Sequence, residues 1–213
     1  MSDCTLYLVS PPTLTPASFV PRLEEALASG TVKAFQLRLK DAQDSQILEA
    51  AQQLLPICQK RGVAFILNDR ADLARTCGAD GVHLGQDDMS IKEARAIVGS
   101  DCIIGATCHA SRDLAMDAAQ AGADYVAFGA FFPTTSKPQE KIEKWGVPTP
   151  EIVEIWSATT VIPCVAIGGM TPANCAPLVK AGADFIAVIN YVWNHPAGSG
   201  AAVAEFAEVL LKA

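Results

Sequence analysis

Eight short apolar runs, separated by longer segments with helical periodicity, limit the possible folds of this chain more than any other feature. The runs lie at residues 6–9, 34–39, 64–67, 81–84, 103–107, 125–129, 164–167 and 185–189. Nearly every residue in them is apolar, which is typical of parallel strands that are buried on both faces. Eight such strands alternating with helices are what a closed (β/α)8 barrel requires. We therefore predict an α/β protein with a TIM-barrel fold.

The segments between the runs have the pattern of amphipathic helices. In residues 47–60, for example, apolar side chains recur every three or four positions, opposite Glu49, Gln52 and Gln53. Three segments end in a short repeat, Cys-Gly-Ala-Asp or Ala-Gly-Ala-Asp, at 77–80, 121–124 and 181–184. Its glycine suits the left-handed backbone position just past a helix end, so each copy marks a turn from helix to strand. Since no linker divides the chain, we expect residues 1–213 to form one TIM-barrel domain.

Charge and cysteine content exclude several classes of protein. The net charge of −7 and the lack of any basic run make a nucleic-acid partner unfavourable. The seven cysteines are odd in number and contain no Cys-x-x-Cys pair, which is typical of reduced thiols. A metal site of Cys102, Cys108 and His109 is an alternative to the preferred interpretation, buried thiols. No signal peptide and no apolar run of ~18 residues is found, so we expect a cytoplasmic protein without a membrane partner.

Polar residues follow the second apolar run, at the strand end where barrel enzymes carry their sites. Strand alternation places Gln36, Arg38 and Lys40 on one face. Two cations and an amide that face the same way can bind a phosphate or diphosphate. The alternative is a layer of salt bridges that point into the barrel.

Acidic residues follow the third and fourth runs. Asp69 comes after Asn68, and Asp88 ends the stretch His-Leu-Gly-Gln-Asp-Asp that begins at His83. Carboxylates at neighbouring strand ends can share Mg²⁺, so both aspartates are candidate metal ligands. Each could instead be a helix N-cap, because a helical segment follows it. We assign no acid or base role to His83, since a lone histidine is more often structural.

The last two strands and the loop after the sixth contribute a second group of candidates. Gly168 and Gly169 end the seventh strand, where their N–H groups can approach a phosphate closely. Ile189 and Asn190 end the eighth strand. The irregular segment 131–148 carries hydroxyls and a lysine at 134–137, which suit phosphate binding, and the alternative is an ordinary solvated loop.

Taken together, these motifs resemble the thiamine phosphate synthase family, which includes TenI-like paralogues. The resemblance runs from residue 6 to about residue 210 and rests on Gln-x-Arg-x-Lys, Asn-Asp, Gly-Val-His-Leu-Gly-Gln-Asp-Asp and Ile-Gly-Gly, in matching order. It implies a transferase that joins hydroxymethylpyrimidine diphosphate to hydroxyethylthiazole phosphate and releases pyrophosphate. These two substrates are the expected partners, Mg²⁺ is the expected cofactor, and a homo-oligomer is possible.

The resemblance also implies roles for individual residues. Asp69 and Asp88 would hold Mg²⁺, and Arg38, Lys40 and Lys137 would be catalytic. The other substrate-binding positions that it implies are Gln36, Leu37, Leu39, Asn68, Thr107, Thr134, Thr135, Ser136, Gly169, Ile189 and Asn190.

Some positions depart from the family pattern. Leu39 replaces a common acidic residue, Ala130 replaces a proline, and Thr107 and Ser136 each exchange one hydroxyl residue for another. Asn190-Tyr191 replaces a typical Ser-Ala, so Tyr191 and Trp193 could narrow the thiazole-phosphate pocket. We expect strand alternation to turn Tyr191 outward or against the last helix instead.

The implied mechanism is dissociative. Mg²⁺ and the basic residues stabilise departing pyrophosphate, the aminopyrimidine carries the resulting cation, and the thiazole nitrogen attacks it. The alternatives are a TenI-like thiazole tautomerase, a non-catalytic regulatory barrel that binds thiamine precursors, and an unrelated epimerase or aldolase. The absence of a prominent lysine near the sixth strand end disfavours the aldolase.

Overall fold

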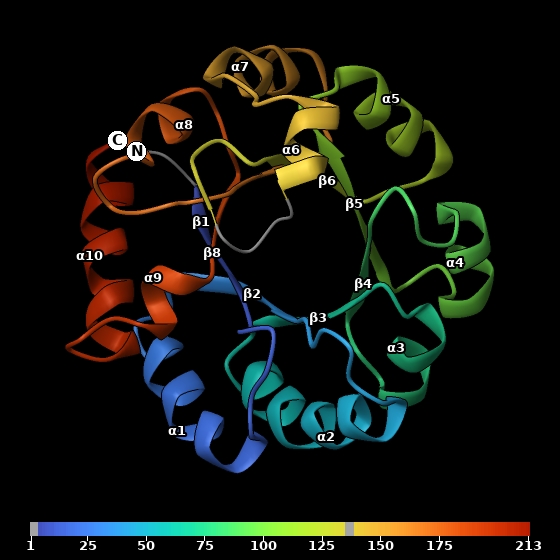
Figure 1. Ribbon diagram of the computed structural model, residues 1–213, viewed down its shortest axis with the longest axis vertical. Helices are drawn as coiled ribbons and strands as arrows, with labels where there is room; N and C mark the ends of the chain where they lie inside the picture. Colours follow the sequence, from blue (N-terminus) through green and yellow to red (C-terminus); the bar gives the residue numbers. More distant parts are fainter. Residues whose placement is uncertain (1–3, 135–138) are drawn as a thin grey trace.

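The protein is a closed barrel of eight parallel strands surrounded by helices (Figure 1). The computed structural model describes residues 4–134 and 139–213. Each strand pairs with the next in the chain, and β8 pairs with β1 to close the barrel. The predicted TIM-barrel fold is therefore confirmed. Among the described residues, no helix is both long and apolar enough to cross a membrane.

The elements follow the predicted alternation. The strands are β1 (Thr5–Val9), β2 (Val32–Leu37), β3 (Ala64–Asn68), β4 (Gly81–Leu84), β5 (Ile103–His109), β6 (Tyr125–Gly129), β7 (Cys164–Ile167) and β8 (Phe185–Val188). The helices are α1 (Pro16–Ala26), α2 (Asp44–Lys60), α3 (Ala71–Cys77), α4 (Ile91–Val98), α5 (Arg112–Ala121), α6 (Gln139–Trp145), α7 (Pro150–Thr159), α8 (Ala176–Lys180), α9 (Asn190–Trp193) and α10 (Ser199–Lys212).

Side chains of each strand alternate between two apolar layers. In β1, Leu6 and Leu8 pack outward against the helices, whereas Tyr7 and Val9 point into the barrel. The interior layer comprises Tyr7, Val9, Ala34, Ile66, Tyr125, Ala127, Val165 and Ala187. Both faces of the strands are buried, which explains why the sequence shows continuous apolar runs.

The Gly-Ala-Asp repeat joins neighbouring strands at their amino-terminal ends. Its three glycines have φ values of 73°, 98° and 94°, as the turn prediction requires. The aspartates that precede β4, β6 and β8 each accept a hydrogen bond from a backbone N–H near the start of the preceding strand. The pairs are Asp80 with Phe65 (2.7 Å), Asp124 with Ile104 (2.7 Å) and Asp184 with Cys164 (2.8 Å). These bonds lie at the opposite end of the barrel from the polar strand ends that the sequence singled out.

Candidate active site

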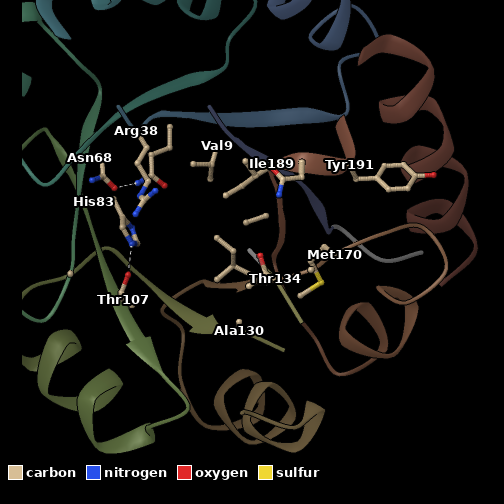
Figure 2. Close-up of a pocket in the computed structure, with 18 of the residues that line it drawn as sticks. Val9, Arg38, Asn68, His83, Thr107, Ala130, Thr134, Met170, Ile189 and Tyr191 are labelled. Atoms are coloured by element: carbon tan, nitrogen blue, oxygen red, sulfur yellow. Dashed lines mark hydrogen bonds between the residues drawn. The ribbon is translucent and has the colours of Figure 1, made fainter. Parts of the chain in front are cut away.

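A pocket of about 1080 Å³ opens at the carboxyl ends of the strands, and each of the eight strands contributes to its lining. Figure 2 shows Arg38, Asn68, His83 and Thr107 on one side of the pocket and Met170 and Ile189 on the other. The pocket therefore has two walls that differ in chemistry.

The basic part of the first wall follows β2. This strand ends at Leu37, earlier than predicted, yet Gln36, Arg38 and Lys40 all line the pocket. The chain beyond β2 is held by the loop after β1: the Arg38 N–H donates to Ser10 Oγ (2.9 Å), and the Lys40 N–H donates to a carbonyl of that loop. Within residues 4–134 and 139–213, no carboxylate forms an ion pair with Arg38 or Lys40. The alternative of an inward-pointing layer of salt bridges is therefore not found among the described residues. Both cations face the pocket.

The two leucines between these residues lie elsewhere. The side chains of Leu37 and Leu39 pack against the core between the barrel and its helices. Only their backbone groups could take part in substrate binding.

Asp69 and Asp88 both line the pocket. Neither is a helix N-cap, because Arg70 occupies that position in α3 and Ser90 occupies it in α4. Asp69 has a left-handed backbone (φ 63°), which is unusual for a residue with a side chain and is found often at functional sites. Asp88 Oδ2 accepts a hydrogen bond from the Gly85 N–H at 2.7 Å, which fixes its carboxylate at the end of β4.

A buried polar network lies beneath this wall. His83 Nε2 lies 2.8 Å from Thr107 Oγ1, and His83 Nδ1 lies 2.8 Å from the Tyr125 hydroxyl. The Tyr125 hydroxyl lies 2.9 Å from that of Tyr7. Tyr7 donates to Gln36 Oε1 (3.2 Å), so the network returns to the pocket wall.

The network residues are neutral at physiological pH. Burial lowers the pKa of His83 to about 4, although Asp88 opposes the shift and Arg38 adds to it. Burial also raises the pKa of the Tyr7 and Tyr125 hydroxyls well above their usual range. Sequence reasoning missed both tyrosines, because each lies inside a run that reads as apolar. Strand alternation places both tyrosines on the barrel interior, and a tyrosine there needs a hydrogen-bond partner, which is the signal that could have identified them.

Backbone from the β6 and β7 ends forms much of the second wall. Gly168 and Gly169 have φ values of 110° and 62° and line the pocket with Thr134. A Cβ on Gly169 would lie 2.5 Å from the Pro133 carbonyl oxygen, so the two segments pack backbone to backbone. Gly169 is therefore required by the fold itself, whatever the pocket binds.

Asn190 and Tyr191 complete this wall. Helix α9 begins at Asn190, so strand alternation does not govern the direction of Tyr191. The Tyr191 ring nevertheless packs edge-on against Phe206 of α10, and its hydroxyl donates to Glu205. The expectation that Tyr191 turns toward the last helix is confirmed, for a different reason, and its flank still borders the pocket.

Trp193 lies away from the pocket. Its ring is buried against Phe19 and Phe35, and its Nε1 donates to the Val9 carbonyl at 2.6 Å. The suggestion that Trp193 narrows the pocket is wrong. Three predicted residues of the loop after β6, Thr135, Ser136 and Lys137, lie outside the described residues.

The cysteines of the described residues form no disulfides. Cys58 and Cys108 are buried, and burial raises the pKa of each to about 12. No group of three or more His, Cys, Asp or Glu side chains suited to a metal occurs among the described residues. The metal site suggested for Cys102, Cys108 and His109 is therefore not formed there.

Comparison with known proteins gives a consistent result. The family model described as thiamine monophosphate synthase matches residues 6–192. The chain is 55% identical to thiamine-phosphate synthase of Rhodospirillum centenum over 211 residues, which cover 99% of each protein. It is 51% identical to thiamine-phosphate synthase of Erythrobacter litoralis, with 98% of this chain and 96% of the relative covered. The solved structure of thiamine phosphate pyrophosphorylase from Pyrococcus furiosus is 31% identical, with a TM-score of 0.85 and coverage of 99% and 97%.

Proposed function

Because this chain belongs to the thiamine monophosphate synthase family, and is thus a transferase of thiamine biosynthesis, we propose which substrates it joins and how. It couples hydroxymethylpyrimidine diphosphate to hydroxyethylthiazole phosphate and releases pyrophosphate. The observation that carries the proposal is one cavity with two walls of different chemistry, each of which has polar groups that suit a phosphate. Its volume of about 1080 Å³ lies at the upper end for small-molecule sites, which gives room for two substrates side by side.

The first wall suits the diphosphate. Arg38 and Lys40 supply positive charge, and the amides of Gln36 and Asn68 supply N–H donors. In the second wall, Thr134, Gly169 and Asn190 offer hydroxyl, backbone and amide groups for a single phosphate.

The residues at the mouth of β3 and β4 fit Mg²⁺. Asp69 and Asp88 are hard oxygen donors on neighbouring strand ends. Mg²⁺ commonly takes one or two carboxylates and completes its shell with water and substrate phosphate oxygens, so a larger protein cluster is not needed. When bound, Mg²⁺ would neutralise charge on the diphosphate and on departing pyrophosphate.

The side chains then favour a dissociative reaction. The Arg38 and Lys40 charges stabilise the negative charge that grows as the C–O bond to pyrophosphate breaks. Lys137, for which the family resemblance implies the same role, would add a third cation. The apolar lining from Val9, Ile167 and Ala187 limits water near the pyrimidine cation until the thiazole nitrogen attacks.

The mechanism requires no strong general base. His83 is buried, its pKa is lowered to about 4, and it is therefore a poor base at neutral pH. His83 is therefore not suited to the proton transfers that a tautomerase requires.

The test is Mg²⁺-dependent release of pyrophosphate from the two substrates. We expect release with both substrates and Mg²⁺, and loss of most activity on chelation. Arg38→Ala should lower kcat strongly, whereas the matched control Arg112→Ala, at an exposed position on α5, should not. A wild-type protein that releases no pyrophosphate, or equal activities of the two variants, would contradict the proposal.

A further inference from the structure

Five hydrogen bonds form a continuous chain across the barrel, directly below the pocket. It runs through one residue from each of β5, β4, β6, β1, β2 and β3. In that order the bonds are Thr107 to His83 (2.8 Å), His83 to Tyr125 (2.8 Å), Tyr125 to Tyr7 (2.9 Å), Tyr7 to Gln36 (3.2 Å) and Gln36 to Asn68 (2.6 Å). We refer to these six residues as the relay.

The amide end of the relay fixes the direction of the tyrosine bonds. Gln36 donates from Nε2 to Asn68 Oδ1, and its Oε1 can only accept, so Tyr7 must donate to it. A phenol has one proton, and Tyr7 therefore accepts from Tyr125. Because the Tyr125 proton is donated to Tyr7, the Tyr125 oxygen can only accept a hydrogen bond from His83 Nδ1.

The direction continues through the histidine. The His83 ring is buried and its two nitrogens contact hydroxyl groups. Burial outweighs the opposing effect of Asp88, so the ring carries only one proton. A neutral imidazole with its proton on Nδ1 has a lone pair on Nε2, so Nε2 accepts from the Thr107 hydroxyl. Thr107 Oγ1 therefore directs lone pairs, and no proton, toward the pocket.

The fold makes room for the relay. A Cβ on Gly105 of β5 would lie 1.9 Å from the Tyr125 ring, so this glycine permits the ring to occupy the barrel interior. Tyr7 and Tyr125 do not border the pocket, whereas the four other relay residues do. The two tyrosines can thus act on a substrate only by orienting those residues.

We propose that the relay makes the Thr107 hydroxyl an obligate hydrogen-bond acceptor and thereby selects a pyrimidine with an exocyclic amine. The opposite end presents N–H donors from Gln36 and Asn68, which complement a ring nitrogen or a phosphate oxygen. The inference rests on the proposed substrates. It also adds a catalytic consequence, because an amine that shares positive charge with the ring donates more strongly, so the bond to Thr107 strengthens in the transition state.

The direction of the hydrogen bonds in the relay can be measured without any substrate, by ¹⁵N NMR of the His83 ring at neutral pH. We expect the proton on Nδ1 in the wild-type protein. In Tyr125→Phe the Nδ1 loses its acceptor, so the proton should move to Nε2 and donate to Thr107. Ser199→Ala, which removes a buried hydroxyl at the start of α10 outside the relay, is the matched control and should leave the tautomer unchanged. A wild-type His83 protonated on Nε2, or on both nitrogens, overturns the proposal.

The functional readout is selectivity between hydroxymethylpyrimidine diphosphate and its 4-oxo analogue, which presents a carbonyl oxygen in place of the amine. Tyr125→Phe should reduce this selectivity, measured as a ratio of kcat/KM values, by about 10- to 100-fold. We expect Tyr125→Phe to lower mainly the kcat for the amine substrate and to leave the KM for thiazole phosphate unchanged. A general loss of stability would not separate the two parameters in this way.

Tyr7→Phe offers a second test that does not depend on the folding of Tyr125→Phe. Because the bonds act in series, it should give the same change in selectivity, and the double variant should be no worse than either single one. Unchanged selectivity in folded Tyr7→Phe and Tyr125→Phe would refute the relay. If the wild-type protein forms no thiamine phosphate, the proposed function fails, while the NMR result still decides the polarity of the relay.

Discussion

Replacing Asp184 by alanine should destabilise the barrel without affecting its pocket. Asp184 is the last of the three repeated aspartates, and its Oδ2 accepts from the Cys164 N–H at 2.8 Å, at the start of β7. Alanine removes the acceptor and leaves this N–H without the partner that joins the start of β7 to the turn before β8.

The magnitude follows from the kind of bond that is lost. A hydrogen bond to a charged group contributes about 1.5–3 kcal/mol. The Asp184 side chain is exposed, so water can reach part of the site, and we expect a loss of about 2 kcal/mol. Asp184→Asn keeps a neutral acceptor and should lose about half as much. Asp124→Ala should cost slightly more, since Asp124 also pairs with Arg95 at 2.6 Å, although exposed ion pairs add only about 0–1 kcal/mol.

Urea unfolding followed by circular dichroism measures these differences, with kcat/KM measured in parallel. Asp117→Ala, at an exposed position on α5, is the matched control and should change stability by less than about 0.5 kcal/mol. Activity should be unchanged in every folded variant, because the repeat lies at the amino-terminal ends of the strands. If Asp184→Ala were as stable as the Asp117 control, the role given to the repeat would be refuted.

Three further predictions concern the pocket and the thiols. Asp69→Ala and Asp88→Ala should each lower kcat by about 10²-fold or more at limiting Mg²⁺ with the fold intact, and near-normal turnover in both would refute the metal assignment. Asn190→Ser should preserve or improve activity, because a hydroxyl can replace the amide donor; calorimetry showing lost thiazole phosphate binding would contradict this. With the pKa of each raised to about 12, Cys58 and Cys108 should resist iodoacetamide at pH 8 in the native protein and react after unfolding, as read by mass spectrometry.

The barrel could be predicted from the sequence because its signal is local. Strands buried on both faces give continuous apolar runs, and the glycine of each repeat gives the turn. The hydrogen bond made by the aspartate of the same repeat could not be predicted, because its partner lies 15 or 20 residues earlier in the chain. Only the parallel pairing of the strands brings the two together.

The pocket was predictable to the extent that polar residues follow strand ends. Gln36, Arg38, Asp69 and Asp88 all border it, as expected. The buried relay was not predictable, because Tyr7 and Tyr125 are 118 residues apart and meet only when the barrel closes. The role of Gly169 could not be predicted for another reason. A close backbone approach and a phosphate site both favour glycine, so the residue type does not distinguish between them.

The most direct test of the central claim is detection of thiamine phosphate itself. The purified protein is incubated with hydroxymethylpyrimidine diphosphate, hydroxyethylthiazole phosphate and Mg²⁺, and the products are separated and identified by mass. We predict thiamine phosphate and pyrophosphate in equal amounts, with neither formed when one substrate is left out. Absence of thiamine phosphate from the complete mixture, with a protein that circular dichroism shows to be folded, would contradict the account.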